Sequence, residues 1–277
     1  MGGSATDASV VVVAYDALPW LERCLESVRG VETVVVDHGS SDGTVAFVRE
    51  RFPEVEVVEQ ENRGLAYGWN TGLARTHGRW ILLLNSDAWL DGGALEELVR
   101  FGEAHPRAAV VAPRLRYPDG RLQRSVRGFP TLWRIATEYL FLRKLAPRSR
   151  ALNAFYAGPV SHDEPVQAEW IMGAVWLVRR AAVDEVGPAD DGFFLFSEET
   201  DWAWRFRDAG WQVWLDPAGG ATHVYGASHG GRMFAQNVQS QLRLLRKHRG
   251  ETYARAARWI FLAGLLLRRR LDVARSL

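Results

Sequence analysis

Residues 82–91 are LLLNSDAWLD, a run of leucines that ends in a tight polar cluster. A strand buried in a sheet explains the leucines, and the preceding residues extend that strand back to Arg79. Burial does not explain why Asn85, Ser86 and Asp87 stand together where the strand should end. The stretch therefore predicts a buried strand that brings a carboxylate to one edge of a sheet.

Strand and helix patterns alternate on both sides of this strand. Strands are expected at residues 9–15, 31–37, 54–60, 79–85 and 108–115, and helices at residues 19–28, 44–52, 65–77 and 95–105. Continuous apolar strands joined by helices indicate a parallel sheet that is covered on both faces. The expected fold class is therefore α/β, with a mostly parallel sheet and helices on both faces.

The chain after residue 116 is less regular. Residues 117–167 carry several arginines and aromatic residues and favour loops and short helices. Beyond them we expect a strand or strand pair at 168–180 broken by Gly173, a helix that ends at Gly210, a strand at 211–216, and helices at 233–249 and 251–271. C-terminal helices therefore follow the α/β part of the fold.

Composition narrows the class of protein. With 277 residues, of which 47% are hydrophobic, the chain can bury a large core in one domain or in two closely packed ones. The net charge of +1 gives no reason to expect a nucleic-acid partner. Cys24 is the only cysteine, which excludes an internal disulfide and a cysteine zinc site and fits a reducing compartment.

We expect neither a targeting segment nor a membrane-spanning one. The first nine residues, MGGSATDAS, lack the basic and apolar regions of a signal peptide. The longest apolar run is WIFLAGLLL at 259–267, far shorter than the roughly 20 residues that a spanning helix needs. The expected localisation is therefore cytoplasmic.

Polar residues follow four of the expected strands. Tyr15 and Asp16 follow the first strand, DHGSSDGT follows the second, ENRG the third and NSD the fourth. In a parallel sheet, ligands bind beyond the carboxyl ends of the strands. Ordinary turn chemistry could account for any one of these clusters. Four clusters on one edge favour a crevice that binds a ligand.

The chemistry of this edge suits a nucleotide held with a divalent metal. There is no GxGxxG after the first strand and no GxxxxGK[ST] in the chain, which disfavours a Rossmann dehydrogenase and a P-loop enzyme. Asp37 could accept a hydrogen bond from a base N–H or cap a turn. Asp87 offers a hard oxygen ligand to Mg²⁺ or Mn²⁺, and Asn85 could orient the loop or bind the sugar.

Six segments in order resemble the family 2 inverting glycosyltransferases, which have the GT-A fold. They are VVVVAYDALPWLERCLESV, VVVDHGSSDGT, ENRGLAYGWNTGL, WILLLNSDAWL, WIMGAVWLVRRAAV and FFLFSEETDWAWRFRDAGW. Within that family they are most similar to bacterial rhamnosyltransferase-like enzymes that build cell-wall or polysaccharide linkages. The resemblance implies a domain over 1–250, with a nucleotide-sugar half at about 9–116 and an acceptor half at about 117–250. An amphipathic helix at 251–277 follows.

The resemblance also implies a donor site for a dTDP- or UDP-sugar together with Mn²⁺ or Mg²⁺. NSD stands at the family's DxD motif, so Asp87 would ligate the metal, although Asn85 replaces the first aspartate. His223 lies where the family often has a histidine that contacts the metal or diphosphate; His229 is a weaker alternative, and Arg232 could bind diphosphate. The donor-site residues implied are Ala14, Tyr15, Asp37, Arg63, Gly64, Asn70, Asn85, Ser86 and Asp87.

SEETD stands where the family has an E-D-x-D motif. Glu199 therefore falls on the position of the catalytic base, and Glu198 is the competing candidate. An inverting transfer needs one base to deprotonate the acceptor hydroxyl as it attacks the anomeric carbon. Repulsion among these glutamates and Asp201 could raise one pKa toward the working pH, or the three could simply favour the N-terminus of a helix.

The expected function is transfer of a sugar, L-rhamnose by resemblance, to a hydroxyl of a glycan or polyprenyl-linked acceptor. Transfer of another hexose stays open. A nucleotidyltransferase would carry a glycine-rich, basic loop after the first strand, and AYDALPW has none. A non-catalytic nucleotide-sugar binder also stays open, because Asn85 and Glu199 depart from the family motifs.

The C-terminal segment RAARWIFLAGLLLRRRLDVARSL raises the question of a membrane. Its apolar residues include Trp259 and Leu266, and its basic residues include Arg255 and Arg258. Such a helix could lie in a membrane interface and meet a polyprenyl-linked acceptor. It could equally pack on the catalytic domain or on a second subunit, as in a homodimer. Peripheral association with the inner face of the cell membrane is therefore a hypothesis.

Overall fold

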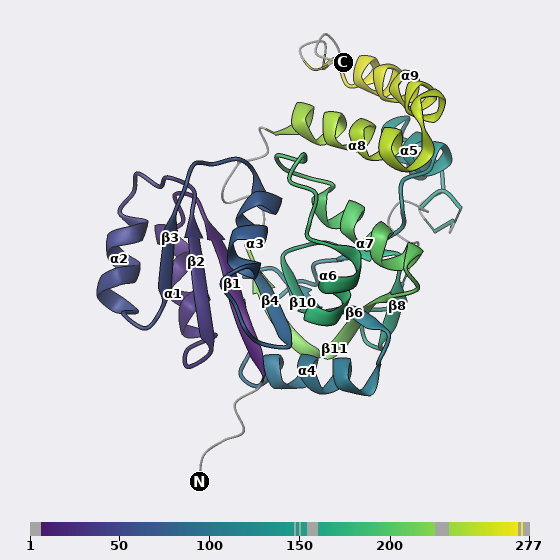
Figure 1. The fold of residues 1–277 in the computed structure, drawn as a ribbon. Coiled ribbons are helices and arrows are strands. Elements are labelled where there is room, and N and C mark those ends of the chain that lie inside the picture. Colours follow the sequence, from purple (N-terminus) through teal and green to yellow (C-terminus); the bar gives the residue numbers. More distant parts are fainter. Residues whose placement is uncertain are drawn as a thin grey trace.

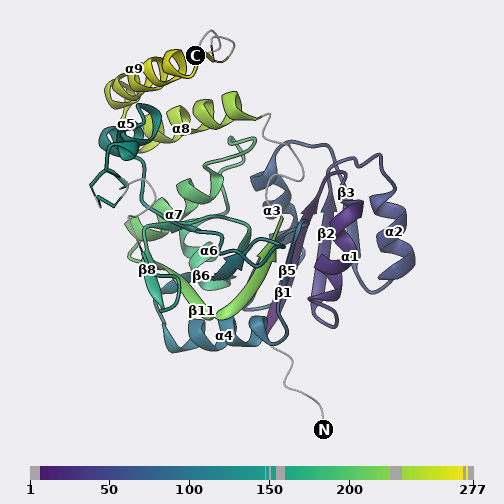
Figure 2. The same ribbon diagram turned by 180° about the vertical axis from the view of Figure 1, so that it is seen from behind.

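The computed structural model describes residues 7–146, 148–149, 151–153, 160–224, 233–270 and 273. Its centre is a nine-stranded sheet with helices on both faces, and a separate layer of helices stands at one end (Figures 1 and 2). The sheet contains β1 (Ala8–Ala14), β2 (Glu32–Asp37), β3 (Glu56–Glu59), β4 (Trp80–Asn85), β5 (Ala88–Leu90), β6 (Ala108–Arg116), β8 (Val166–Ala168), β10 (Val175–Arg179) and β11 (Gln212–His223). Two short strands, β7 (Val126–Arg127) and β9 (Trp170–Ile171), pair separately.

The strand order is β3-β2-β1-β4-β10-β6-β11-β5, with β8 paired to β11. The strands from β3 to β4 run parallel, and so do β6 and β11. In contrast, β10 lies antiparallel between β4 and β6, and β5 and β8 are antiparallel to β11. The expected α/β class with a mostly parallel sheet is confirmed, and both parts of the chain contribute strands to one sheet.

Each face of the sheet is covered by its own apolar cluster. Along β1, the side chains of Val10 and Val12 belong to one cluster and Val11 to the other, because successive residues of a strand point to opposite faces. The first cluster includes α1 (Leu18–Glu26), α2 (Thr44–Arg51) and α4 (Ala94–Ala104); the second includes α3 (Leu65–Leu73), α6 (Arg180–Val186) and α7 (Glu198–Asp208). Burial on both faces explains the continuous apolar strands of the sequence.

Several elements differ in length from the prediction, among them β3, which spans Glu56–Glu59 rather than residues 54–60. Two of the differences have a clear structural cause. Helix α3 ends at Leu73 rather than at residue 77, because the guanidinium of Arg180 binds the carbonyl oxygens of Thr76 and Gly78 at 2.7 Å each. Strand β11 extends past residue 216, through a register shift between Asp216 and Gly220, as far as His223. That irregularity carries His223 to the polar edge of the sheet.

The end layer contains α5 (Leu132–Tyr139), a 3₁₀ turn at Leu142–Lys144, α8 (Phe234–Arg249) and α9 (Glu251–Leu267). Its core joins α5 to both C-terminal helices through buried side chains such as Ile135, Leu245 and Phe261. The C-terminal helix therefore packs on the molecule along one side. No helix in the described part of the chain combines the length and the hydrophobicity that crossing a bilayer requires.

Candidate active site

One cavity of about 1010 Å³ opens at the carboxyl ends of the strands and extends to the end layer. Its wall is formed by the ends of β1 and β4, by the loop that enters α7, and by side chains of α5 and α8. The predicted site residues that line it are Ala14, Tyr15, Gly64, Asn85, Ser86, Asp87, Glu198, Glu199 and His223. The structure thus brings residues predicted for the donor site, the metal and the base to one cavity, whose wall also includes side chains of α5 and α8.

Asp87 and His223 lie side by side in this cavity. The Nε2 atom of His223 is 3.3 Å from Oδ1 of Asp87, and both side chains are largely buried. On its other side, Nδ1 of His223 is 2.8 Å from Oε1 of Gln123, and the amide of Gln123 also donates to the backbone carbonyl of His223. Because an amide oxygen only accepts, Nδ1 is the donor in this contact, and Nε2 is the ring nitrogen that faces Asp87.

This arrangement fits a divalent cation. A carboxylate oxygen and an imidazole nitrogen that point at the same space are suitable ligands for Mn²⁺, and a carboxylate alone suits Mg²⁺. Gln123 holds the other nitrogen of the His223 ring, as outer hydrogen bonds do for metal-binding histidines in other proteins. Within the described residues, no group of three or more histidine, cysteine, aspartate or glutamate side chains could hold a metal. Asp87 and His223 would therefore need ligand oxygens to complete the shell.

Asp37 has a different environment from the rest of the donor-side residues. Its carboxylate is buried and accepts hydrogen bonds from the backbone N–H groups of Gly39 and Ser40 and from the Ser40 hydroxyl. It therefore stabilises the loop that follows β2. The neighbouring His38 also lines the cavity, although no sequence pattern indicated it, and burial, which disfavours the charged ring, lowers its pKa.

The segment before α3 shows how close the two halves of the cavity approach each other. Gly64 has φ +106°, and a β-carbon there would lie 2.4 Å from the carbonyl oxygen of Phe194. Asn70 exchanges two hydrogen bonds with the backbone of Ala189, and the Arg63 guanidinium stacks over a tyrosine ring. In this structure Asn70 therefore joins α3 to the loop before α7, and Gly64 lets that loop approach.

Glu198 and Glu199 begin α7, directly after two residues with left-handed backbone. Phe196 and Ser197 have φ +68° and +72°, which is uncommon for residues other than glycine and clusters at functional sites. The Oε2 atoms of both glutamates are buried without a hydrogen-bond partner. Burial raises the pKa of Glu199 to about 7, against three backbone N–H groups that lower it. Burial and repulsion from Glu199 raise the pKa of Glu198 well above its usual range.

Asp201, one turn further along α7, is fully buried and paired with three basic side chains. His248 and Lys247 of α8 approach its Oδ1 at 2.7 and 2.8 Å, and Arg205 approaches its Oδ2 at 2.9 Å. Burial alone would raise the pKa of Asp201, but these hydrogen bonds and charges lower it to about 2. Lys247 also contacts Asp190 at 2.6 Å, in the loop before α7. Helix α8 therefore holds the N-terminal part of α7 in place.

Several residues at the site had no signal in the sequence. Gln123 lies 100 residues from the histidine that it contacts, and the irregular stretch 117–167 gave no reason to choose it. Tyr139 of α5 and Phe234 of α8 face the same cavity from distant segments. Only tertiary structure joins these residues. His229 and Arg232 lie outside the described residues.

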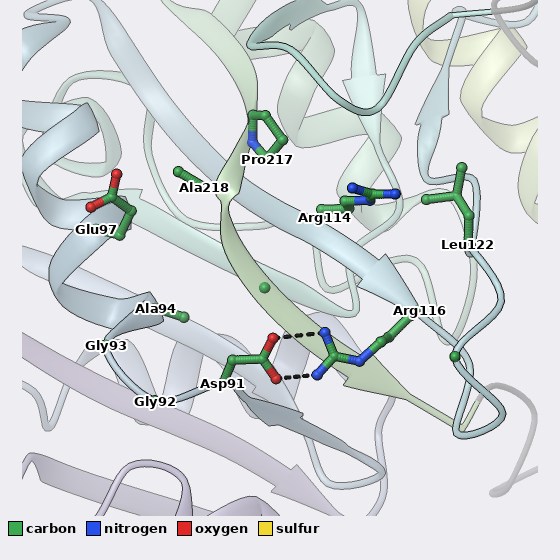
Figure 3. A pocket seen from close by; sticks show the side chains of 12 residues that line it. Asp91, Gly92, Gly93, Ala94, Glu97, Arg114, Arg116, Leu122, Pro217 and Ala218 are labelled. Atoms are coloured by element: carbon green, nitrogen blue, oxygen red, sulfur yellow. Dashed lines mark hydrogen bonds and ion pairs between the residues drawn. The ribbon is translucent and has the colours of Figure 1, made fainter.

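A second cavity, of about 460 Å³, lies between β11 and the start of α4 (Figure 3). Figure 3 shows the carboxylate of Asp91 and the guanidinium of Arg116, which both line this cavity, joined through two pairs of atoms. Arg114 pairs with Asp163 at 3.0 Å. Both arginines are thus paired with carboxylates. Among its lining residues this cavity has no counterpart of the Asp87–His223 pair or of the two adjacent glutamates.

Residues 9–161, more than half of the chain, match the family model described as glycosyl transferase family 2. The N-acetylglucosaminyl-diphospho-decaprenol L-rhamnosyltransferase of Mycobacterium tuberculosis (strain ATCC 25618 / H37Rv) is 29% identical over 97% of this chain and 93% of its own length. The pre-mycofactocin glycosyltransferase of the same strain is 28% identical over 80% of this chain and 43% of its own length.

Solved structures share the fold at low identity. The mannosyltransferase PcManGT from Pyrobaculum calidifontis, in complex with GDP-Man and Mn²⁺, has a TM-score of 0.62 and 18% identity, over 94% of this chain and 75% of that one. GalNAc-T7 with UDP, GalNAc and Mn²⁺ has a TM-score of 0.62 and 16% identity, over 86% of this chain and 47% of that one. The chain is therefore a member of glycosyl transferase family 2 with a GT-A fold, similar to an L-rhamnosyltransferase.

Proposed function

We propose that this chain is a metal-dependent inverting glycosyltransferase that moves L-rhamnose from a dTDP- or UDP-linked donor to a hydroxyl of a lipid-linked glycan. The observation that carries the proposal is that one cavity holds both the Asp87–His223 pair and the protonatable Glu199. The similarity to an L-rhamnosyltransferase over nearly the whole chain supports the sugar and the acceptor class. The product would serve cell-wall or polysaccharide assembly.

On the donor side, Ala14, Tyr15, Asn85 and Ser86 line the cavity and would contact the nucleotide sugar. We assign these residues to a nucleotide-sugar half at about 9–116 and the base to an acceptor half at about 117–250. Asp37, at the end of β2, would accept a hydrogen bond from an N–H group of the nucleotide base. Arg63, Gly64 and Asn70 would complete the donor site by fixing the segment that enters α3.

Asp87 and His223 would hold Mn²⁺ or Mg²⁺, with diphosphate oxygens as the remaining ligands. Such a cation, when bound, neutralises the negative charge of a departing diphosphate. Asn85 keeps an amide where the family motif has its first carboxylate, so the protein would supply one carboxylate rather than two. The role of His223 is then to add a second protein ligand, oriented by Gln123.

Glu199 is our proposed base. It retains partial exposure, whereas Glu198 is almost completely buried, so Glu199 is the glutamate that an acceptor hydroxyl can approach. The pKa of Glu199, raised to about 7, lets its carboxylate accept a proton near neutral pH. Glu199 receives the hydroxyl proton as that oxygen attacks the anomeric carbon from the face opposite the leaving diphosphate. Glu198 is the alternative.

On the acceptor side, the cavity wall is largely aromatic and apolar, with Trp170, Tyr139 and Phe234 among its residues. Aromatic faces suit sugar rings and isoprenoid chains alike. A polyprenyl-linked acceptor would place the reaction at the inner face of the cell membrane. We propose no nucleic-acid partner, and a homodimer remains a separate hypothesis.

The proposal is tested by calorimetric titration of dTDP-rhamnose, UDP-glucose, UDP-galactose and GDP-mannose, with and without Mn²⁺. We expect one donor to bind, with a metal-dependent gain that Asp87→Asn reduces by tenfold or more, in line with about 10–100-fold losses at metal sites. Asp91→Asn is the matched control, because it removes a nearby carboxylate that pairs with Arg116. Absence of binding by every donor, or equal loss in both variants, would contradict the donor site.

Turnover separates catalysis from binding alone. Glu199→Gln should reduce the rate of transfer by about 10²-fold or more, because one positioned base contributes about 10²–10⁴-fold, while donor binding stays intact. A donor that binds normally but is never transferred by the unaltered protein would favour the alternative, a nucleotide-sugar binder of the same fold. Tight binding of another donor would keep the mechanism and replace rhamnose.

A further inference from the structure

Helix α9 carries two apolar faces rather than one. Along the first face, Ala257, Phe261 and Leu265 are buried against α5 and α8. Along the second face, Trp259 is 73% exposed and Leu266 is 57% exposed. A surface helix of a globular protein normally has a single apolar stripe that faces its core. The second stripe therefore calls for something outside the described fold to cover it.

The spacing makes this second stripe continuous. Trp259 is followed at four and seven positions by Ala263 and Leu266, which places the three side chains on one side of the helix. All three are exposed, and Leu267, 63% exposed, widens the stripe at its end. We name Trp259, Ala263, Leu266 and Leu267 the outer stripe.

Positive charge accompanies the outer stripe. Residues 251–270, which contain α9, include five arginines and one acidic residue, although the whole chain carries only +1. Arg255 and Arg258 are exposed on α9, next to the stripe when the helix is viewed end-on. An apolar stripe with arginines beside it is the pattern of a helix that lies in the plane of a membrane interface, where arginines meet lipid phosphates.

We propose that the outer stripe of α9 docks on an anionic lipid bilayer, with the helix lying in the interface plane. A second copy of the chain is the less favourable occupant. A two-fold interface through this face would bring the arginines of both copies together, and like charges facing each other destabilise an interface. Anionic headgroups complement the same arginines. The inference deepens the proposed function and rests on it for the lipid-linked acceptor.

The end layer lies between the outer stripe and the cavity, so docking on a bilayer would also bring the cavity close to the membrane. Figures 1 and 2 show α9 at the outer edge of the end layer, with α5 and α8 between it and the sheet. Those same two helices contribute Tyr139 and Phe234 to the cavity wall. A protein docked through α9 would therefore hold one wall of its cavity close to the bilayer, within reach of an acceptor whose lipid stays in the membrane.

The test is co-sedimentation of the full chain with vesicles of phosphatidylcholine alone or with phosphatidylglycerol added. We expect binding to the anionic vesicles that weakens with salt. Trp259→Ser combined with Leu266→Ser should lower the partition coefficient by about tenfold or more, since interfacial binding scales with buried apolar area. Arg255→Gln combined with Arg258→Gln should lower it only on anionic vesicles. Leu122→Ser is the matched control, because it alters an exposed leucine outside the layer.

Equal partition of the stripe variant and the control, or no binding to either vesicle, would overturn the inference. So would dimers, seen by light scattering, that the stripe variant abolishes while vesicles remain unbound. Circular dichroism and thermal unfolding of each variant establish that it folds. Donor binding measured without vesicles should be unchanged in the stripe variant, so a failed docking test and a failed donor site give different results.

Discussion

Glu199 combines a cost in stability at high pH with a chemical use, because burial raises its pKa to about 7 from an ordinary value of 4.5. The folded state therefore holds this proton more tightly than the unfolded chain does. The resulting contribution to stability is complete below pH 4.5, declines as the pH rises, and is lost once the pH passes about 7. At higher pH the folded protein must keep a buried carboxylate charged.

Glu199→Gln should therefore stabilise the fold above pH 7 while it slows transfer. We expect a gain on the order of 1–3 kcal/mol at pH 8, which shrinks toward zero near pH 4.5. Thermal unfolding at both pH values measures it, and Glu59→Gln at the exposed end of β3 is the control. A variant that is less stable than the parent at pH 8 would show that the Glu199 carboxylate is held by favourable contacts instead.

At the scale of elements, α8 controls the geometry of α7 through Asp201. Lys247→Met should remove one cation from a fully buried carboxylate and also release Asp190. We expect a loss of about 1–2 kcal/mol in stability, because two other basic groups remain paired with Asp201. The rate of transfer should fall while the KM for the donor stays nearly constant, since the donor-side residues lie elsewhere.

Arg246→Met is the matched control for this prediction. Arg246 lies on the same helix with the same charge, but it pairs with exposed Glu251 at the outside of the layer. Lys247→Arg should restore the rate, because it keeps the cation. If Lys247→Met and Arg246→Met reduce the rate equally, α8 does not position the base through Asp201.

Much of the element layout follows from local patterns. Burial on two faces requires continuous apolar strands, which predict the β-branched runs and the helices between them. Left-handed backbone after a helix favours glycine, which predicts the helix end near Gly210. The antiparallel direction of β10 was not predicted, because a short run of buried apolar residues looks the same in either direction. The pairing of Asp87 with His223 was anticipated only by family resemblance. Gln123 was missed because nothing in the sequence connects it to residues a hundred positions away.

At the scale of the whole molecule, both halves of the chain share one sheet. Strand β10 lies between β4 and β6, and β11 extends the sheet beyond β6. Neither half can keep its central strands paired without the other. We therefore expect one cooperative transition, in which the calorimetric enthalpy of unfolding equals the van't Hoff enthalpy. Scanning calorimetry of the full chain measures both enthalpies, and two resolved transitions would mean that two parts of the chain unfold as separate domains.

The place of β10 also has a consequence for folding during synthesis. Val175 follows Asn85 by 90 residues, so the ribosome releases β4 and β6 well before the strand that joins them exists. During that interval two apolar strand edges lack their partner, and unpaired edges are where chains aggregate. Pairing over such a separation is also slow, because the chain loses the entropy of closing the loop before any stabilising contact forms. The order of synthesis, more than the final stability, should therefore limit the yield of folded enzyme, and holding chaperones should matter most before residue 179 emerges.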